Sequence, residues 1–585
     1  MDGTDSGPNF PVAVTEADGV QESMKRVVSL FVLALNVVWA QGLTPDQKLA
    51  DFQYLAATYA KQYGPADWKR AALGVDILNL TPWLDKVRRT TTDLQFYDVM
   101  SEYVASFNDG HTGYIIPSGF VARLQFTVDI YDGKLLVDNI NRTRLPGAEY
   151  PFVIGYELVS IDGEDATKIL DRLERYNVWG YARATRRAAA SLITSRFQRL
   201  IPNAPANLPE ISSVVFRRPD GQLETYRLPW NKSGLPLVSP GVIPPFTVKS
   251  ARRGEAEPVD APDYQSLIYS LVQCEVPGVK AVNGQGALAP LFLGGLDAGF
   301  TRRLGGPGDP FFSGIIPAGR YKIGFIRIPT FVPPDFNAAV LAFQREVAFF
   351  QANTDGLIID EMRNGGGSVG YTNALLSHLM PTRWRAIGFE IRATSNWVAN
   401  YSNIVETVKA LGAPPAIVAT YQAVRDELVA ANAEGRLTKP LSLDGTELER
   451  DPLRDARGGL LAYTKPLMVL TDEFSASASE MFAAAIQDNE RGILFGWRTT
   501  GAGGNVVSDS MGSFSQGLFS VTQSLMSRKA PVLTSEFPAA PYVENIGVRP
   551  DITADYMTRA NLVGQGQPFV YGFTAAMIAH IEKNK

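Results

Sequence analysis

Two short segments of this 585-residue chain carry the residue types of an acyl-transfer site. In the first, alternating serine and alanine (SASAS, 475–479) follow an apolar strand pattern and lead into an alanine-rich helical pattern. A hydroxyl at a helix start lies near the positive end of the helix dipole, which favours negative charge on its oxygen. In the second, three glycines (365–367) follow the buried strand pattern GLIIDE, and their missing side chains leave N–H groups open to an oxyanion. The two segments are interpreted as a nucleophile and a backbone oxyanion cradle.

Both segments also have structural interpretations. Serines at a helix start can cap its first-turn N–H groups, and this capping role is favoured for Ser475 and Ser479 taken alone. A glycine cluster alone is typical of a turn, so the position of this one directly after IIDE makes the signal specific.

With these motifs, the chain resembles the C-terminal processing (tail-specific) serine protease family over roughly residues 321–554. The resemblance implies that the middle serine of the run, Ser477, is the nucleophile. It implies an oxyanion hole formed by Gly366, Gly367 and Ala478. It also assigns a supporting role to Asp488, about three helical turns after the nucleophile.

The general base differs from that of the best-known branch of this family. That branch uses a lysine downstream of the nucleophile, and here the stretch TTGAG (499–503) places Ala502 at that position. A second branch, which includes tricorn and the chlamydial protease-like activity factor, uses a histidine oriented by a downstream glutamate. Of the three histidines, His378 lies in a helical pattern and His580 lies near the C-terminus, whereas His111 lies in the glycine-flanked loop NDGHTGY.

The resemblance therefore implies that His111 is the base, since an imidazole with a pKa of roughly 6.5 can accept and return a proton near neutral pH. A solvent-facing loop histidine is the alternative. The orienting acid is assigned to Glu544, in VENIGVRPD, with Glu536 as a competitor, and either carboxylate could instead pair with Arg549.

The elements that position these residues follow from periodicity. Apolar residues recur at helical spacing from about Thr44 to Ser106, short alternating strands follow, and strands then alternate with helices from about Tyr321. The strand–turn–helix of residues 154–176 resembles part of a PDZ domain, which captures peptides by strand addition; a β-rich spacer without a ligand is the alternative. The predicted catalytic core is an α/β, ClpP/crotonase-like parallel or mixed sheet flanked by helices.

We predict five segments along the chain. They are an upstream extension with a signal peptide (1–40), a helical N-terminal region carrying His111 (41–120), a PDZ-like domain (121–234), a linker or insertion (235–317) and the catalytic core (318–585).

Composition narrows the classes of function. A net charge of −5 gives no electrostatic reason to expect a nucleic-acid partner, and no stretch after the signal peptide is apolar enough for a membrane span. The segment Met24–Ala40 has the basic start, apolar stretch and small end of a signal peptide, with a short buried helix as the alternative, so we expect a secreted or periplasmic protein. Cys274 is the only cysteine, which excludes an intrachain disulfide, and no zinc-binding or phosphate-binding motif is present.

The sequence thus predicts an exported serine endopeptidase that needs no metal or cofactor and acts on peptides or proteins, with homo-oligomer formation left open. The competing hypothesis is a secreted peptide-binding pseudoprotease that has lost its base, and Ala502 at the family's lysine position favours it.

Overall fold

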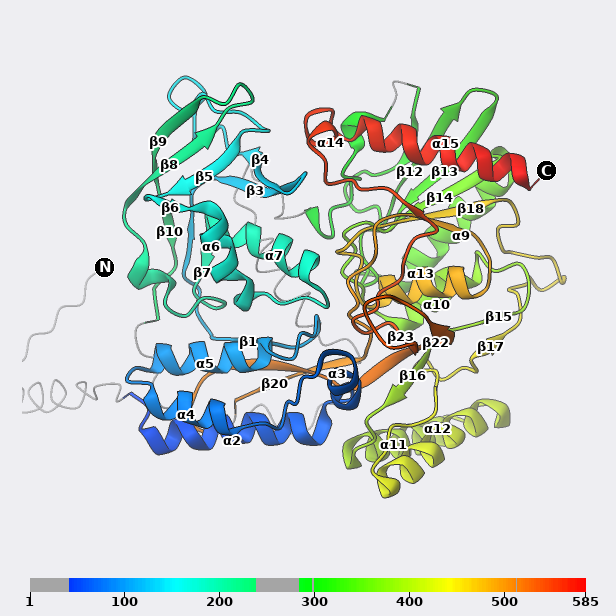
Figure 1. The fold of residues 1–585 in the computed structure, drawn as a ribbon. Helices are drawn as coiled ribbons and strands as arrows, with labels where there is room; N and C mark the ends of the chain where they lie inside the picture. Colours follow the sequence, from blue (N-terminus) through cyan, green and yellow to red (C-terminus); the bar gives the residue numbers. More distant parts are fainter. Residues whose placement is uncertain (1–41, 238–283, 297–298, 512, 585) are drawn as a thin grey trace, which may run out of the picture.

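The computed structural model describes residues 42–237, 284–296, 299–511 and 513–584. The predicted signal peptide and Cys274 lie outside these residues. Figure 1 shows an N-terminal helical layer, a β-rich domain above it and a larger α/β core beside both.

The N-terminal region is helical, as predicted. It comprises α2 (Pro45–Gln62), α3 (Ala66–Leu73), α4 (Thr81–Arg89) and α5 (Asp93–Ala105). Thr44 and Thr92 cap α2 and α5, each accepting a hydrogen bond from the backbone N–H of a glutamine three residues later, which satisfies a donor that the helix start leaves unpaired. Strand β1 (Gly113–Ile115) then pairs with β21 (Leu518–Thr522), and this pairing brings the His111 loop to the core.

The second domain is a sheet of order β3-β4-β5-β8-β9 covered by two helices. Its strands are β3 (Phe126–Tyr131), β4 (Lys134–Ile140), β5 (Glu157–Ile161), β8 (Ile211–Arg217) and β9 (Leu223–Pro229), and β6 (Glu164–Asp165) pairs with β5. Its helices are α6 (Ala166–Leu173) and α7 (Ala182–Thr194). The short strands β2 (Val121–Arg123), β7 (Ser195–Phe197) and β10 (Asn231–Ser233) form a separate small sheet. Helix α7 lies between this domain and the core (Figure 1).

The core is a mixed sheet of order β11-β12-β13-β14-β18-β19-β24. The strands are β11 (Thr301–Leu304), β12 (Phe312–Ala318), β13 (Tyr321–Arg327), β14 (Gly356–Asp360), β18 (Leu467–Thr471), β19 (Ile493–Gly496) and β24 (Ile552–Thr553). The five strands from β13 to β24 in this order run parallel to one another, whereas β12 pairs antiparallel with both β11 and β13. The predicted core fold is confirmed.

Helices cover both faces of this sheet. On one face lie α9 (Phe336–Asn353), α10 (Val369–Ser377) and α13 (Ala478–Asp488), and on the other lies α15 (Gln567–Lys583). In β14, Leu357 and Ile359 belong to the apolar core under α9, α10 and α13, and Ile358 belongs to the apolar core under α15. Successive side chains of a strand alternate between the two faces of the sheet. A strand buried on both faces reads as the continuous apolar run seen in the sequence.

Two strands of the core sheet, β11 and β12, fall within the segment predicted as a linker or insertion. The sequence pattern of these strands is a weak strand signal. Strand β11 reads TRRL and lies at the sheet edge, and β12 reads FSGIIPA, with glycine and proline inside the strand.

Further elements complete the core. Helices α11 (Ser395–Ala410) and α12 (Pro415–Glu434) form a helical hairpin. Strand β16 (Gly388–Ile391) pairs with β22 (Ser524–Val532), which pairs with β23 (Ala540–Tyr542), and β20 (Val506–Ser510) pairs with β21. The short pair β15 (Trp384–Arg385) and β17 (Glu449–Arg450), and helix α14 (Arg559–Val563), are peripheral. No helix in the described ranges combines the length and the apolar character that crossing a membrane requires.

Candidate active site

Ser477 lies at a sharp turn between β18 and α13. It is the residue before the first residue of α13, and its backbone has φ 57° and ψ −119°. A non-glycine residue in such a conformation carries strain of about 1–3 kcal/mol, which persists only where the surrounding structure enforces it. The residue is buried, with 9% of its surface exposed. The turn therefore presents one hydroxyl at the start of a buried helix.

The glycine loop approaches this turn closely. A Cβ placed on Gly366 would lie 2.6 Å from the Ser477 Cβ and 2.8 Å from the Ala478 nitrogen. The two segments are joined by a hydrogen bond from the Ala476 N–H to the Asn364 carbonyl (2.9 Å). Only glycine fits at this position, since φ of Gly366 is also +99°.

The N–H groups of this cradle are not equivalent. The Gly366 N–H, which the family resemblance implied as an oxyanion donor, donates in this structure to the Asn364 side-chain oxygen (2.9 Å), and Gly366 contributes the close approach of the two segments. The Gly367 N–H and the Ala478 N–H have no acceptor within the described part of the chain. Gly367 forms an isolated β-bridge with Phe331. The Phe331 N–H donates to the Gly366 carbonyl, and the Phe331 carbonyl accepts the Ser368 N–H.

Glu480 fixes the Ser477 turn to the loop of residues 499–503. Its carboxylate accepts the N–H groups of Ser477 (3.1 Å), Gly501 (2.6 Å) and Ala502 (2.8 Å), and the Thr499 hydroxyl (2.6 Å). Burial raises the pKa of Glu480, while these four hydrogen bonds act in the opposite direction. The S-x-x-E spacing from Ser477 to Glu480 was visible in the sequence as a capping-box pattern, but its wider bracing role was not.

The His111 loop lies against the same 499–503 segment. A Cβ on Gly110 would be 2.9 Å from the Ala502 side chain. The His111 N–H donates to the Asp109 carboxylate (2.7 Å), and its carbonyl accepts the Ser520 hydroxyl (2.7 Å). The imidazole is 1% exposed, and neither ring nitrogen has a hydrogen-bond partner among residues with described positions. Ala502, at the family's lysine position, is thus covered by the loop that carries the histidine.

Glu544 contacts the same segment and is fully buried. One oxygen accepts the Gly503 N–H (2.9 Å), and the other pairs with the Lys69 ammonium. Lys69 also donates to the Asn108 carbonyl (2.9 Å) and to the Asn545 side-chain oxygen (2.7 Å), and so it joins the His111 loop to the Glu544 turn. Burial, aided by the nearby Asp109 charge, raises the pKa of Glu544 to about 7 although Lys69 opposes the shift.

The competing carboxylate has a different position. Glu536 is half-exposed and pairs with Arg498 (2.9 Å) and Arg549 (3.1 Å). Pairing with Arg549 is the structural role that the sequence left open for either glutamate. Glu544 does not use Arg549 and pairs with Lys69 instead, a lysine that no sequence motif marked.

The remaining predicted residues lie away from the turn. Asp488 ends α13 and binds Arg528 (2.5 Å), which attaches the helix to β22. The His378 ring bonds to the Ala374 carbonyl (2.9 Å), and burial lowers its pKa. His580 is on α15, and burial also lowers its pKa.

Two protein-family models match the chain. Residues 322–554 match Peptidase family S41, and residues 121–236 match a PDZ domain. The first range contains the strained serine and the glycine loop, and the second contains β3 and α7.

Similar proteins are found among both sequences and solved structures. A Chlamydia trachomatis protein is 27% identical over 570 residues, covering 88% of this chain and 90% of the relative. The chloroplastic C-terminal processing peptidase of Tetradesmus obliquus is 25% identical over 240 residues, or 41% of this chain and 36% of the relative. The structure of mature CPAF complexed with lactacystin shares this fold with a TM-score of 0.70 at 23% identity, covering 92% of this chain and 99% of that one.

Proposed function

We propose that this serine-type endopeptidase, whose residues 322–554 match Peptidase family S41, uses Ser477 as its nucleophile and His111 as its general base. The observation that carries the proposal is the strained serine at the start of α13, with the open N–H groups of Gly367 and Ala478 beside it. The substrate is a peptide or protein.

In the proposed reaction, the Ser477 hydroxyl attacks the peptide carbonyl while an imidazole nitrogen of His111 accepts its proton. The carbonyl oxygen becomes negative and accepts hydrogen bonds from the Gly367 and Ala478 N–H groups. The same imidazole returns the proton to the departing amine, leaving an acyl-enzyme. Water, deprotonated by the imidazole, then hydrolyses this ester and restores the serine.

The start of α13 supports the oxyanion role. The dipole of this helix places positive charge at the Ala478 N–H, and the donors are already fixed by the bond between the Ala476 N–H and the Asn364 carbonyl. Removing one such donor typically lowers kcat by about 10²–10³-fold.

Glu544 is the proposed orienting acid. It is buried, pairs with Lys69 and accepts the N–H of Gly503, next to Ala502, which the His111 loop covers. Glu536 is instead half-exposed and engaged by two arginines. Because the Glu544 carboxyl has a pKa of about 7, its orienting charge is present above that pH and is lost below it. A Glu544→Gln variant should therefore lose much of the rate that the wild type gains as pH rises through 7, and an unchanged pH profile would exclude this role.

We also propose that the protein is exported, on the strength of the Met24–Ala40 pattern. Expression of the full chain in a bacterium with a secretory pathway should yield exported protein whose N-terminus is Gln41. Retention in the cytoplasm with an intact N-terminus would contradict the proposal.

A fluorophosphonate probe tests the nucleophile directly, because it phosphonylates activated serines. We expect wild-type protein to be labelled on the tryptic peptide that contains Ser477, and the Ser477→Ala variant to remain unlabelled. An unlabelled, folded wild type would support the alternative of a peptide-binding pseudoprotease, which Ala502 at the lysine position favours.

A further inference from the structure

The PDZ-like domain contacts the peptidase core through its sheet edge. Strand β3 is an outer strand of that sheet, and α7 lies beside it. A PDZ domain that captures a peptide adds it as a strand at such an edge. Here a buried ion pair joins the two elements: Arg187 of α7 binds Asp129 of β3 through Nε–Oδ1 (3.0 Å) and Nη2–Oδ2 (2.6 Å). Both residues are at most 1% exposed.

The nucleophile loop of the core meets this pair. Glu473, four residues before Ser477, has a carboxylate oxygen 2.9 Å from Nη1 of Arg187 and 2.6 Å from Nε of Arg183. The ring of Phe474 lies 4.8 Å from the Arg187 guanidinium and packs edge-on against a tryptophan of the PDZ-like domain. The space beside α7 is therefore filled by a segment of this same chain.

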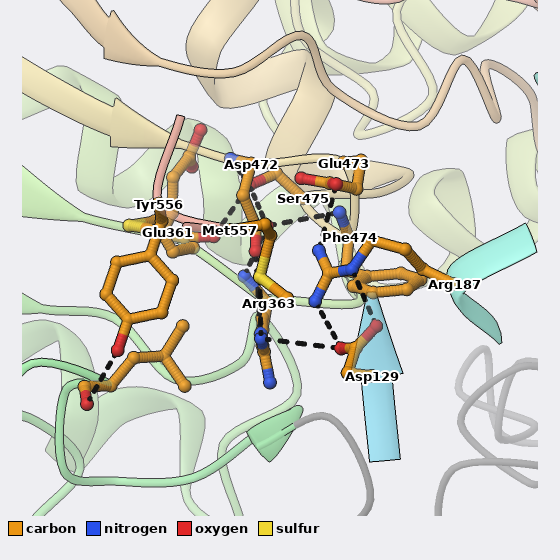
Figure 2. Close-up of polar contacts among 12 residues, drawn as sticks. Asp129, Arg187, Glu361, Arg363, Asp472, Glu473, Phe474, Ser475, Tyr556 and Met557 are labelled. Atoms are coloured by element: carbon orange, nitrogen blue, oxygen red, sulfur yellow. Dashed lines mark hydrogen bonds and ion pairs between the residues drawn. The ribbon is translucent and has the colours of Figure 1, made fainter. Parts of the chain in front are cut away.

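The oxyanion loop meets the same aspartate from the other side. Arg363, four residues before Gly367, places Nη2 4.0 Å from the second oxygen of Asp129. Its backbone has φ 56°, and its N–H donates to the Asp472 carboxylate (2.8 Å). Figure 2 shows Arg187 and Arg363 pointing to Asp129 from two directions.

The charges of this cluster depend on one another. Burial would raise the pKa of Glu473, but Arg187 and Arg183 outweigh it and hold the pKa at about 2. Burial also raises the pKa of Asp472, with Glu473 acting in the same direction. Removing one partner from such a buried set leaves an uncompensated charge, which the surrounding loops can relieve only by moving.

We propose that Asp129 of the PDZ-like domain is a positioning residue of the peptidase site. It holds the nucleophile loop through Arg187 and Glu473, and it holds the oxyanion loop through Arg363. Both loops are thereby anchored to the same residue of β3, which keeps the distance between them constant. The proposal also assigns the β3–α7 edge to internal bracing in place of substrate capture. It rests on the proposed roles of Ser477 and Gly367.

The test compares Asp129→Asn with a matched control, Glu346→Gln. Glu346 is a buried carboxylate bound by both Nε (3.0 Å) and Nη2 (2.8 Å) of Arg303, at the β11 edge of the core sheet. Each variant is assayed for the rate of Ser477 labelling by a small fluorophosphonate and for kcat and KM on a long peptide. The small probe reaches the serine without needing a peptide-docking surface.

We expect Asp129→Asn to slow both labelling and kcat by about tenfold or more with KM changed less than about twofold, because displaced catalytic loops lose alignment for every acylating reagent. Glu346→Gln should keep both rates. If Asp129→Asn does not fold, Arg187→Lys, which keeps the charge but loses the two-point contact, should slow labelling to a smaller extent.

Wild-type labelling rates in Asp129→Asn would overturn the proposal, as would a raised KM with unchanged labelling, which would point to peptide docking at β3. An equal slowing in Glu346→Gln would reduce the effect to general destabilisation. Failure of the proposed function gives a different result, because the wild type itself would then not be labelled at Ser477.

Discussion

Replacement of Gly366 by alanine is the sharpest perturbation of the site, because the clash it creates cannot be relieved by a flexible side chain. The new Cβ would lie 2.6 Å from the Ser477 Cβ, 2.7 Å from the Ala476 carbonyl oxygen and 2.8 Å from the Ala478 nitrogen. Carbon atoms in good contact are about 3.5–4.0 Å apart, so the nucleophile turn and the glycine loop must separate by about 1 Å.

Two consequences follow from this separation. A misplacement of about 1 Å in an active site can lower the rate by about 10²-fold, so we expect that loss in the labelling rate of Ser477. The φ of +99° adds backbone strain of about 1–3 kcal/mol to an overpacking cost of about 1–3 kcal/mol, so the free energy of unfolding should fall by about 2–6 kcal/mol.

Gly370 supplies the matched control within the same segment. It lies in the first turn of α10, and a Cβ there would meet nothing closer than 3.8 Å. Gly370→Ala should keep the labelling rate and should stabilise the helix by up to about 1 kcal/mol. The measurements are the rate of Ser477 labelling and the free energy of unfolding in urea, for both variants and the wild type. A Gly366→Ala protein that is labelled at the wild-type rate would refute the close approach of the two loops.

Three further predictions concern individual residues. Ser477→Gly should exceed Ser477→Ala in free energy of unfolding by about 1 kcal/mol, because glycine adopts the positive φ without strain; equal urea midpoints would deny that strain. Ala502→Lys should lower the free energy of unfolding by more than about 1 kcal/mol and should also lower the labelling rate, because Gly110 of the His111 loop occupies the space that the lysine needs. A gain in activity would contradict this packing. Glu473, with a folded pKa of about 2 below its ordinary 4.5, contributes stability that is present above pH 4.5 and is lost as pH falls towards 2. The difference in unfolding free energy between wild type and Glu473→Gln should therefore shrink between pH 5 and pH 3, and a constant difference would exclude an ionised Glu473.

The main fold could be anticipated because its signals are local. The apolar runs of β14 and β18, and the spacing of small residues after each, follow from burial on both faces of a parallel sheet and from turns that end at helix starts. Strands β11 and β12 could not be recognised in this way, because an edge strand needs no apolar run and a glycine and a proline interrupt the second.

The polar surroundings of the site depend on contacts between distant segments. Lys69 meets Glu544, and Asp129 meets Arg363, across sequence separations that no periodicity records. Glu480 is the exception, since its three-residue spacing from Ser477 is a capping-box pattern that could have indicated its contact with the Ser477 backbone. A single sequence thus indicates the segments of the proposed site, while the charged residues that brace these segments become visible only in the structure.

The most direct measurement is an experimental structure of the protein after reaction with a fluorophosphonate. We predict phosphorus bonded to Ser477 Oγ, the phosphonyl oxygen within about 3 Å of both the Gly367 and Ala478 nitrogens, and a His111 ring nitrogen within about 3 Å of Ser477 Oγ. A phosphonyl oxygen directed away from both N–H groups, or an imidazole beyond hydrogen-bond reach of the modified serine, would contradict the proposed mechanism.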